Sequence, residues 1–578
     1  MGRLALALAA CVLLLLPASA PAADPYAPLK KRLTEFLTRQ MRANQVKGLA
    51  VVLLDGPRIA WMQGFGWADE AQDAPAGPDT VWRMGSISKV VTSYRAAMLA
   101  QAGSLDLDGD VRRHVPAFAV RSRFPEAAIT PRMLMTHHSG LPTDILAGMW
   151  TDRPESLEAF IPRIAGESLC SPPGREWRYS NVGFSLLGRA IEEVEGLPFA
   201  EAMRRGLLAP LGMADSGFEL TPALARRLAQ GYVAGRPAPS PPLRDQPAGS
   251  LYSTAGDMAR FMSFALSGGR GLLTEEWTQR MGVVQFPGHP LDFGLEMGLG
   301  WMVSGLSMAD GHRLWWHGGA AAPFQTLMVV QPDEDLGVAL LSNSMEASRF
   351  LPQAALMALD MALEARTRRR APPPPRVPPP RVVRLAAEEL ASFAGPYATV
   401  GAQLGHVRLA GAGLYADIPG RAFEMVPLLD GAFAVQRDTL AGLFPRLDRE
   451  LSVRPAQTDG RRFLVLQGQA MPLPFEQLPR TPLPPAWTAR LGNYAPDGPC
   501  EGLCYVRLEL AQAQDGVLTA RLFLAAGSAP PGPPAVFPLL PVSDAEAVIA
   551  GAGVGTGQAV RAVEGGLYHS GYLFRPAP

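Results

Sequence analysis

The stretch "RMGSISKVVTSYRAAML" at residues 83–99 contains Lys89, a residue type that the rest of this chain almost avoids. Of the 53 basic residues, only four are lysines: Lys30, Lys31, Lys47 and Lys89. From Ser86 onward the stretch has apolar residues at helical spacing, which predicts a helix that begins near Ser86. Residues three apart share one face of a helix, so the Ser86 hydroxyl and the Lys89 amine are expected to meet.

This pair predicts nucleophilic catalysis. A lysine can accept the serine proton, whereas an arginine, with a pKa above ~12, keeps its own. At a helix N-terminus, backbone N–H groups also point outward and can stabilise an oxyanion. The simpler alternative is that Ser86 only caps the helix and that Lys89 lies on the surface, because a single S-x-x-K motif is weak.

Two downstream motifs supply partners for the serine and the lysine. "PPGREWRYSNVGFSLLG" (172–188) places Tyr179 and Asn181 just before a helical pattern, so that a phenol and an amide are available for proton transfer and substrate binding. "WWHGGAAAPF" (315–324) is a predicted strand edge with His317, Gly318 and Gly319. Glycines there allow a substrate backbone to approach, and the N–H of Ala320 is expected to point into the cleft.

The order Ser86-x-x-Lys89, Tyr179-x-Asn181, His317-Gly318-Gly319 resembles the serine β-lactamase-related superfamily, in particular class C β-lactamases, D,D-peptidases and related esterases. The resemblance covers about residues 30–365 and implies an antiparallel five-stranded sheet flanked by helices. It implies Ser86 as the acylated nucleophile, Lys89 as proton acceptor and Tyr179 as general acid and base. Asn181 and the His317–Ala320 strand would bind the substrate, with the oxyanion hole at the N–H groups of Ser86 and Ala320.

The departures from this resemblance concern the substrate. Many relatives have a K-T-G motif whose lysine and threonine bind the substrate carboxylate, and these positions correspond here to His317 and Gly318. This favours a small ester or a D-amino-acid-containing amide as the acyl substrate. The alternatives are a β-lactamase or D,D-carboxypeptidase acting on β-lactams or peptidoglycan stem peptides, and a non-catalytic binding protein on the same fold.

The sequence lacks the signatures of other enzyme classes. The chain contains no G-x-S-x-G, as an α/β-hydrolase would require. The adjacent histidines of "THH" (136–138) are not spaced as zinc ligands, so we expect neither metal nor cofactor and interpret His137 as structural. Charge is balanced, with 53 acidic residues, and no basic stripe favours nucleic acid as a partner.

The hydrophobic pattern predicts an α+β domain at residues 27–366. A helix at 27–45 and strands at 48–56 and 58–68 begin it, and strands at 312–319, 324–332 and 335–343, followed by a helix near 350–366, end it. Strands from both ends are therefore expected to form one sheet, with a helical insertion between them.

The rest of the 578 residues is expected to be accessory. The Pro/Arg-rich stretch at 367–385 is interpreted as a stiff linker, since proline cannot continue a helix or an inner strand. Residues 386–578 are β-rich and form one unit or two of about 95 residues, each opening with a G-x-Y motif. "CEGLC" favours a local disulfide between Cys500 and Cys504, which leaves Cys170 free.

Residues 1–23 have the pattern of a secretory signal peptide, with an arginine before an apolar run and small residues after it. The sequence thus predicts a secreted or periplasmic protein. The cysteine of "LAAC" lies inside the apolar run, so lipoprotein anchoring is not expected, and no other stretch predicts a transmembrane helix.

Overall fold

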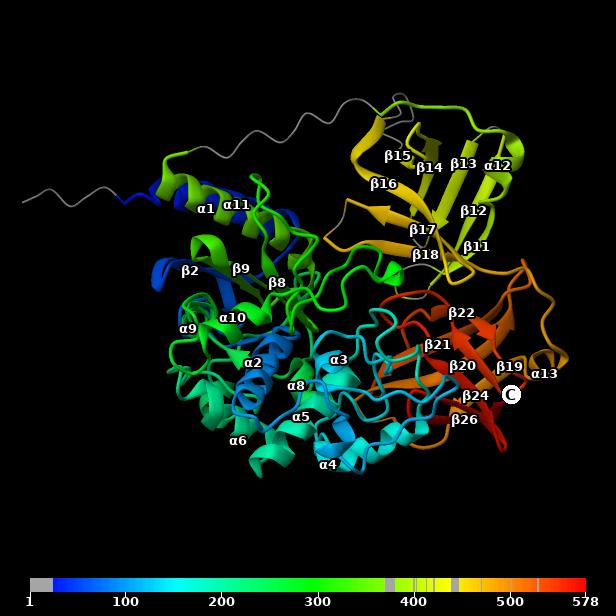
Figure 1. Cartoon of the computed structure of the whole chain (residues 1–578), viewed down its shortest axis with the longest axis horizontal. Helices are drawn as coiled ribbons and strands as arrows, with labels where there is room; N and C mark the ends of the chain where they lie inside the picture. Colours follow the sequence, from blue (N-terminus) through cyan, green and yellow to red (C-terminus); the bar gives the residue numbers. More distant parts are fainter. Residues whose placement is uncertain are drawn as a thin grey trace, which may run out of the picture.

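A computed structural model describes residues 24–369, 380–398, 401, 403–411, 413–418, 421–437, 446–468, 470–500, 502–527 and 530–578. The predicted signal peptide at 1–23 lies outside the described residues, as does most of the predicted linker at 367–385. The described residues form a mixed helix-and-sheet domain followed by two closed eight-stranded barrels, which lie beside it (Figure 1).

The central sheet of the first domain is antiparallel, with the strand order β3-β2-β1-β10-β9-β8. Its strands are β1 (Gly48–Asp55), β2 (Arg58–Asp69), β3 (Ala74–Pro75), β8 (Trp315–Ala321), β9 (Phe324–Gln331) and β10 (Leu336–Ser342). β1 pairs with β10 from Leu49↔Ser342 to Asp55↔Leu336, so strands from both ends of the domain meet at the centre, as predicted.

The strand count corrects the sequence-based expectation, because the sheet has six strands and not five. The sixth strand is β3, which pairs with Trp67 and Asp69 of β2 at the sheet edge. With two residues, one of them a proline, β3 is too short to show the alternation that identifies strands in a sequence.

Helices cover both faces of the sheet (Figure 1). Alternate residues of β1, such as Val51, pack against α1 (Ala27–Ala43) and α11 (Leu351–Thr367). The residues between them, such as Val52, pack against α2 (Ile87–Gln101) and α9 (Ala255–Leu266). Successive strand residues point to opposite faces, so burial on both faces explains the uninterrupted apolar run "GLAVVLL".

The insertion between the two halves of the sheet carries the other α-helices of the first domain: α3 (Pro131–Met135), α4 (Leu157–Phe160), α5 (Asn181–Glu195), α6 (Phe199–Met203), α7 (Pro222–Ala225), α8 (Gln246–Gly249) and α10 (Glu275–Met281). Two short strand pairs accompany them, β4 (Trp82–Arg83) with β7 (Tyr252–Ser253) and β5 (Tyr232–Val233) with β6 (Arg236–Pro237). Within the described ranges, every helix is too short or too polar to span a bilayer.

The C-terminal region consists of two closed barrels. The first is formed by β11 (Gly395–Ala398), β12 (Leu404–Ala410), β13 (Gly413–Ile418), β14 (Arg421–Pro427), β15 (Phe433–Arg437), β16 (Arg446–Thr458), β17 (Arg461–Gln467) and β18 (Leu473–Gln477). The second is formed by β19 (Gly492–Pro496), β20 (Leu503–Gln512), β21 (Leu518–Ala526), β22 (Ala535–Pro541), β23 (Glu546–Ile549), β24 (Ala559–Val563), β25 (Gly566–His569) and β26 (Tyr572–Ala577).

Both barrels begin with the same local structure. A one-turn helix, α12 (Ala387–Ala391) or α13 (Pro485–Thr488), precedes the G-x-Y motif. The tyrosine then donates back to a carbonyl four residues earlier: Tyr397 to Phe393 at 2.8 Å and Tyr494 to Arg490 at 2.7 Å. The repeated G-x-Y motif thus marks the first strand of each barrel. In the second barrel Cys500 and Cys504 form a disulfide, while Cys170 of the first domain is buried and free.

Arg461 of β17 joins the three bodies. Its guanidinium binds Glu476 of its own barrel at 2.7 and 2.8 Å and the carbonyl of Gly551 in the second barrel at 3.0 Å. It also lies 3.5 Å from the carboxylate of Glu176 in the first domain. Both carboxylates are buried, but Glu176 also pairs with Arg178 at 2.8 Å, so Glu476 is the one that depends most on Arg461.

Replacing Arg461 should therefore destabilise the docked arrangement. We expect Arg461→Met to lower the free energy of unfolding by roughly 3 kcal/mol, because the buried carboxylate of Glu476 loses its paired cation. Arg454→Met is the matched control, since Arg454 forms an exposed pair with Asp430 in the same barrel and should cost about 1 kcal/mol or less. Denaturant unfolding followed by tryptophan fluorescence measures both, and equal losses would contradict this role for Arg461.

Candidate active site

Ser86 lies at the N-terminus of α2, directly after a turn that brings it against β8. Gly85 has φ +53°, a left-handed conformation that favours glycine. A Cβ at Gly85 would lie 2.6 Å from the backbone nitrogen of Ala320, so a larger residue would push the turn away from the strand. Ser88 holds the turn from beneath by donating to the Gly85 carbonyl at 2.6 Å and accepting from Leu251 N–H at 2.9 Å.

The Lys89 amine is fully buried and has three oxygen neighbours. Its Nζ lies 2.6 Å from Asn181 Oδ1, 2.8 Å from the Ala248 carbonyl and 3.1 Å from Ser86 Oγ. Burial lowers the pKa of Lys89 to about 7, against the charges of Asp144 and Asp245, which raise it. The amide and carbonyl oxygens only accept hydrogen bonds. In the neutral amine they therefore take the two N–H donors, and the lone pair is left for the Ser86 proton.

Tyr179 completes a chain of hydrogen bonds through Ser86. Its hydroxyl donates to Ser86 Oγ at 2.6 Å, and its ring lies 4.6 Å from Lys89 Nζ and 4.2 Å from the imidazole of His137. Burial raises the pKa of the Tyr179 phenol well above its usual range. Tyr179 and the charged form of Lys89 both donate to Ser86 Oγ, whereas with a neutral Lys89 the serine hydroxyl can donate to Nζ.

His137 supports Tyr179 as a neutral ring. Its Nδ1 accepts the N–H of Ser180 at 3.1 Å, so the ring proton lies on Nε2. Burial, and then the charge of Lys89, lower the pKa of His137 well below its ordinary value. The ring therefore packs against Tyr179 without bringing a charge to the site.

Asn181 begins α5, where the hydroxyl of Ser180 caps the helix by accepting the N–H of Gly183 at 2.8 Å. Its amide Nδ2 donates to Asp144 Oδ1 at 2.7 Å, while its Oδ1 faces Lys89. A carboxylate needs a donor and an amine needs an acceptor, so both neighbours require this orientation of the amide. Sequence reasoning missed Asp144, which lies in a loop without a motif or a periodic pattern.

The β8 strand lines the other side of Ser86. His317 is buried and donates from Nδ1 to the Gly318 carbonyl at 2.6 Å. Burial, and then the charge of Lys89, lower the pKa of His317 to about 4, so it is neutral at neutral pH. A Cβ at Gly319 would lie 2.0 Å from the Met84 carbonyl, which explains the glycine, and Ala320 is exposed beside Gly85. The structure thus brings all eight sequence-predicted site residues together.

The second barrel contacts the loop that carries Asp144. Gly555 N–H donates to Thr143 Oγ at 3.0 Å, and Gln558 donates to the Asp144 carbonyl at 2.9 Å. Thr143 in turn donates to the Tyr179 carbonyl at 2.7 Å. Sequence reasoning found no site residues in this barrel, because these contacts use backbone groups and join segments more than 400 residues apart.

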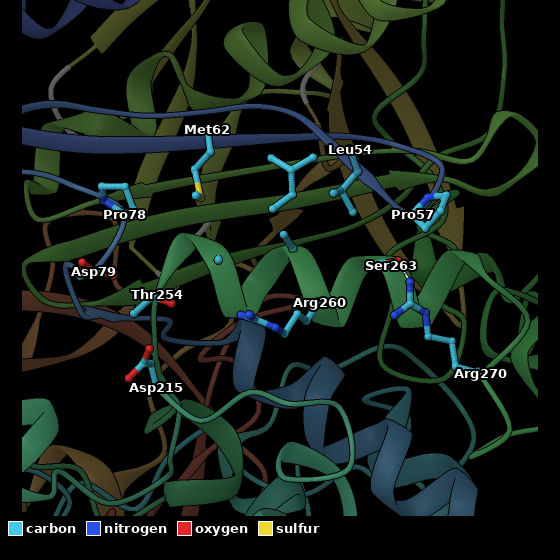
Figure 2. A pocket seen from close by; sticks show the side chains of 13 residues that line it. Leu54, Pro57, Met62, Pro78, Asp79, Asp215, Thr254, Arg260, Ser263 and Arg270 are labelled. Atoms are coloured by element: carbon cyan, nitrogen blue, oxygen red, sulfur yellow. Dashed lines mark hydrogen bonds between the residues drawn. The ribbon is translucent and has the colours of Figure 1, made fainter.

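A cavity of about 340 Å³ lies elsewhere, at the opposite edge of the sheet from β8. Figure 2 shows it between α9, with Arg260 and Ser263, and the strand residues Leu54 and Met62. None of the predicted site residues lines it. Among the described residues, no group of three or more His, Cys, Asp or Glu side chains is placed to hold a metal ion.

Comparison with known proteins places the first domain in a family. Residues 33–363 match the sequence profile of the Beta-lactamase family. The chain therefore belongs to the Beta-lactamase family, a family of serine hydrolases, which confirms the resemblance inferred from the motifs.

The chain is similar to Protein flp of Staphylococcus aureus (strain N315), with 24% identity over 54% of this chain and 63% of that protein. It is also similar to human Putative beta-lactamase-like 1, with 31% identity over 44% of this chain and 53% of that protein. The chain thus spans less than two thirds of the length of these relatives.

Solved structures share the fold. SurE covers 79% of this chain and 100% of its own at 21% identity, with a TM-score of 0.56. The octameric penicillin-binding protein homologue from Pyrococcus abyssi covers 77% of this chain and 99% of its own at 23% identity, with a TM-score of 0.53. The match to EstCE1, a hydrolase with promiscuous acyltransferase activity, covers 59% of this chain and 99% of the EstCE1 chain at 22% identity, with a TM-score of 0.51.

The depressed pKa of Lys89 can be measured without a substrate, because the chain has only four lysines. In protein made with ¹³C-labelled lysine, we expect the ε-carbon resonance of one lysine to titrate near pH 7, since burial disfavours the charged amine. That resonance should be missing from Lys89→Arg. If no lysine resonance moves between about pH 6 and pH 8, the account of a neutral Lys89 is wrong.

Proposed function

We propose that this protein is an exported serine hydrolase that forms an acyl-enzyme at Ser86, with Lys89 as base and Tyr179 as general acid and base. The observation that carries the proposal is the chain of hydrogen bonds at Ser86 Oγ, which lies 2.6 Å from the Tyr179 hydroxyl and 3.1 Å from Lys89 Nζ. Because the other two partners of Lys89 are acceptors, the amine lone pair faces the serine. A non-catalytic binding protein has no need for a buried, neutral lysine in this position.

In acylation, the Ser86 proton moves to Lys89 Nζ as Oγ bonds to the substrate carbonyl carbon. Negative charge develops on the carbonyl oxygen, and the N–H groups of Ser86 and Ala320 stabilise it. The bond to the leaving group then breaks. Tyr179 gives its phenolic proton to the departing oxygen or nitrogen and recovers a proton from Lys89.

In deacylation, a water molecule attacks the acyl carbon and loses its proton to the same pair. The bond between Ser86 Oγ and the acyl carbon breaks, Oγ takes that proton back, and the carboxylic acid leaves. The raised pKa of Tyr179 suits a group that must keep its proton until a leaving group needs it.

The substrate proposed is a small ester or a D-amino-acid-containing amide. His317, at the position where many relatives have a lysine, is neutral, so it supplies no cation for a substrate carboxylate. The structural likeness to EstCE1, a hydrolase with promiscuous acyltransferase activity, supports acyl transfer through Ser86. The β-lactam and stem-peptide alternative needs carboxylate recognition that His317 and Gly318 do not offer.

Export is part of the proposal and rests on the signal-peptide pattern of residues 1–23. The site of action would then be the periplasm or the medium. Detecting the protein in a periplasmic or culture fraction, but not after deletion of residues 2–23, would test it.

Hydrolysis assays test the chemistry. We expect the wild type to hydrolyse p-nitrophenyl esters, and Ser86→Ala to lower the rate constant at least roughly 10³-fold, because the nucleophile is removed. Lys89→Arg should be similarly inactive, since arginine keeps the charge but cannot accept a proton. A chromogenic cephalosporin assayed in parallel separates the alternatives: turnover of the cephalosporin but not of the esters would reverse the substrate assignment.

The pH dependence follows from Lys89. The active form has a neutral amine, so kcat/KM should rise with pH, reach half its maximum near pH 7 and then stay level into the alkaline range. Tyr179 causes no fall below about pH 10, because its pKa is raised. Initial rates on an ester, corrected for spontaneous hydrolysis, give the profile. A rate that decreases from pH 6 to pH 8 would be incompatible with a lysine base.

A further inference from the structure

A cavity of about 330 Å³, which we call the junction cavity, lies where the first domain and both barrels meet. Among the residues that line it are Ser171 and Glu176 of the first domain, Arg461 of the first barrel, and Val548 and Ile549 of the second barrel. Pockets for small molecules often lie at such interfaces and have volumes of about 300–1,000 Å³. The junction cavity is therefore large enough for a small organic molecule.

The charges around the junction cavity cancel in pairs. Four arginines line it, and each pairs with a carboxylate at 2.7 to 3.1 Å: Arg461 with Glu476, Arg178 with Glu176, Arg175 with Asp459 and Arg123 with Glu546. A charged ligand would meet no free counter-ion among these groups, and burying an unpaired charge is costly. The junction cavity therefore favours a neutral ligand.

Three polar groups at the wall of the junction cavity lack a hydrogen-bond partner among the described residues. They are the Ser171 hydroxyl, Glu176 Oε2 and Arg461 Nη1. Ser171 and Glu176 are only 1% and 4% exposed, so bulk water does not replace the missing partners. Glu176 Oε2 lies 3.5 Å from Arg461 Nη1, which is longer than a good hydrogen bond. Buried polar groups without partners are rare in folded proteins, so these three call for a further molecule in the cavity.

The unpaired groups define the chemistry of that molecule. A carboxylate oxygen only accepts hydrogen bonds and a guanidinium only donates them, whereas a hydroxyl does both. A ligand hydroxyl placed between Glu176 Oε2 and Arg461 Nη1 donates to the first and accepts from the second, and Ser171 is left for another hydroxyl. Apolar side chains, among them Leu540 and Val548, also line the cavity and suit C–H groups. A carbohydrate ring combines hydroxyls with C–H faces in this way.

We propose that the junction cavity binds a small neutral carbohydrate, a mono- or disaccharide, which contacts the first domain and both barrels at once. None of the eight predicted active-site residues lines this cavity, so the inference does not depend on the proposed hydrolysis. Because the site exists only when the three bodies are docked, the sugar also stabilises the docked arrangement.

Binding is measured on the full chain by isothermal titration calorimetry with glucose, mannose, N-acetylglucosamine and maltose. We expect at least one of these sugars to bind with a Kd of roughly millimolar or tighter, as is usual for ligands of this size. The same sugar should raise the Tm as its concentration increases. Glucosamine and glucose 6-phosphate should bind at least about tenfold more weakly than the best neutral sugar, because their charges stay unpaired.

Two results would overturn the proposal at this stage. One is the absence of binding for all four neutral sugars at ~50 mM, which would mean that water alone fills the cavity. The other is tighter binding of glucosamine or glucose 6-phosphate than of any neutral sugar, which would contradict the pairing of charges around the cavity.

Ser171→Ala locates the bound sugar. The Ser171 hydroxyl has no protein partner, so its removal leaves the fold intact but should weaken sugar binding about threefold or more. Ser93→Ala is the matched control, since Ser93 of α2 is also buried with an unpartnered hydroxyl but does not line the cavity. It should bind the sugar as the wild type does. Equal affinities for the wild type and Ser171→Ala, or equal losses in both variants, would show that the sugar binds elsewhere and would overturn the assignment.

Discussion

A buried lysine amine that must be able to lose its proton is the constraint on which the rest of this structure depends. Water is excluded around Lys89, and the cost of burying a charge brings its pKa close to neutrality. Its two fixed acceptors, Asn181 Oδ1 and the Ala248 carbonyl, come from separate segments of the insertion. The amine lone pair points toward Ser86 only when both acceptors are bound to the N–H groups of Lys89. Lys89 can therefore act as a base only in the folded domain.

The sheet, the insertion and the second barrel together position the groups around Lys89. Pairing of β1 with β10 joins the two ends of the domain in one sheet, and β8 lies at the far edge. There the left-handed turn at Gly85, directly before Ser86, lies against Ala320. The insertion then supplies Tyr179 and Asn181 from the start of α5. Gly555 and Gln558 of the second barrel contact the loop that carries Thr143 and Asp144. The catalytic groups thus lie where all these layers meet.

Much of this was predictable from the sequence, because helix and strand periods and short motifs are local signals. Ser86 and Lys89 share a helix face by spacing alone, and strands from both ends of the domain are evident as apolar runs. What escaped prediction depends on contacts between distant segments. The Asp144 side chain joins the site through its hydrogen bond with Asn181, the barrel contacts use backbone groups, and β3 has two residues. The roles assigned to the site residues remain predictions.

The most direct test of the central claim is to locate a covalent adduct after reaction with a fluorophosphonate. Trypsin cleaves after Arg83 and after Lys89, and should therefore release the peptide "MGSISK", residues 84–89. Mass spectrometry should find one phosphonyl group per chain, on Ser86 and not on Ser88, whose hydroxyl is buried and bonded to Gly85. Lys89→Arg should remain unlabelled under the same conditions. Labelling at another residue, or equally fast labelling of Lys89→Arg, would contradict activation of Ser86 by a neutral lysine.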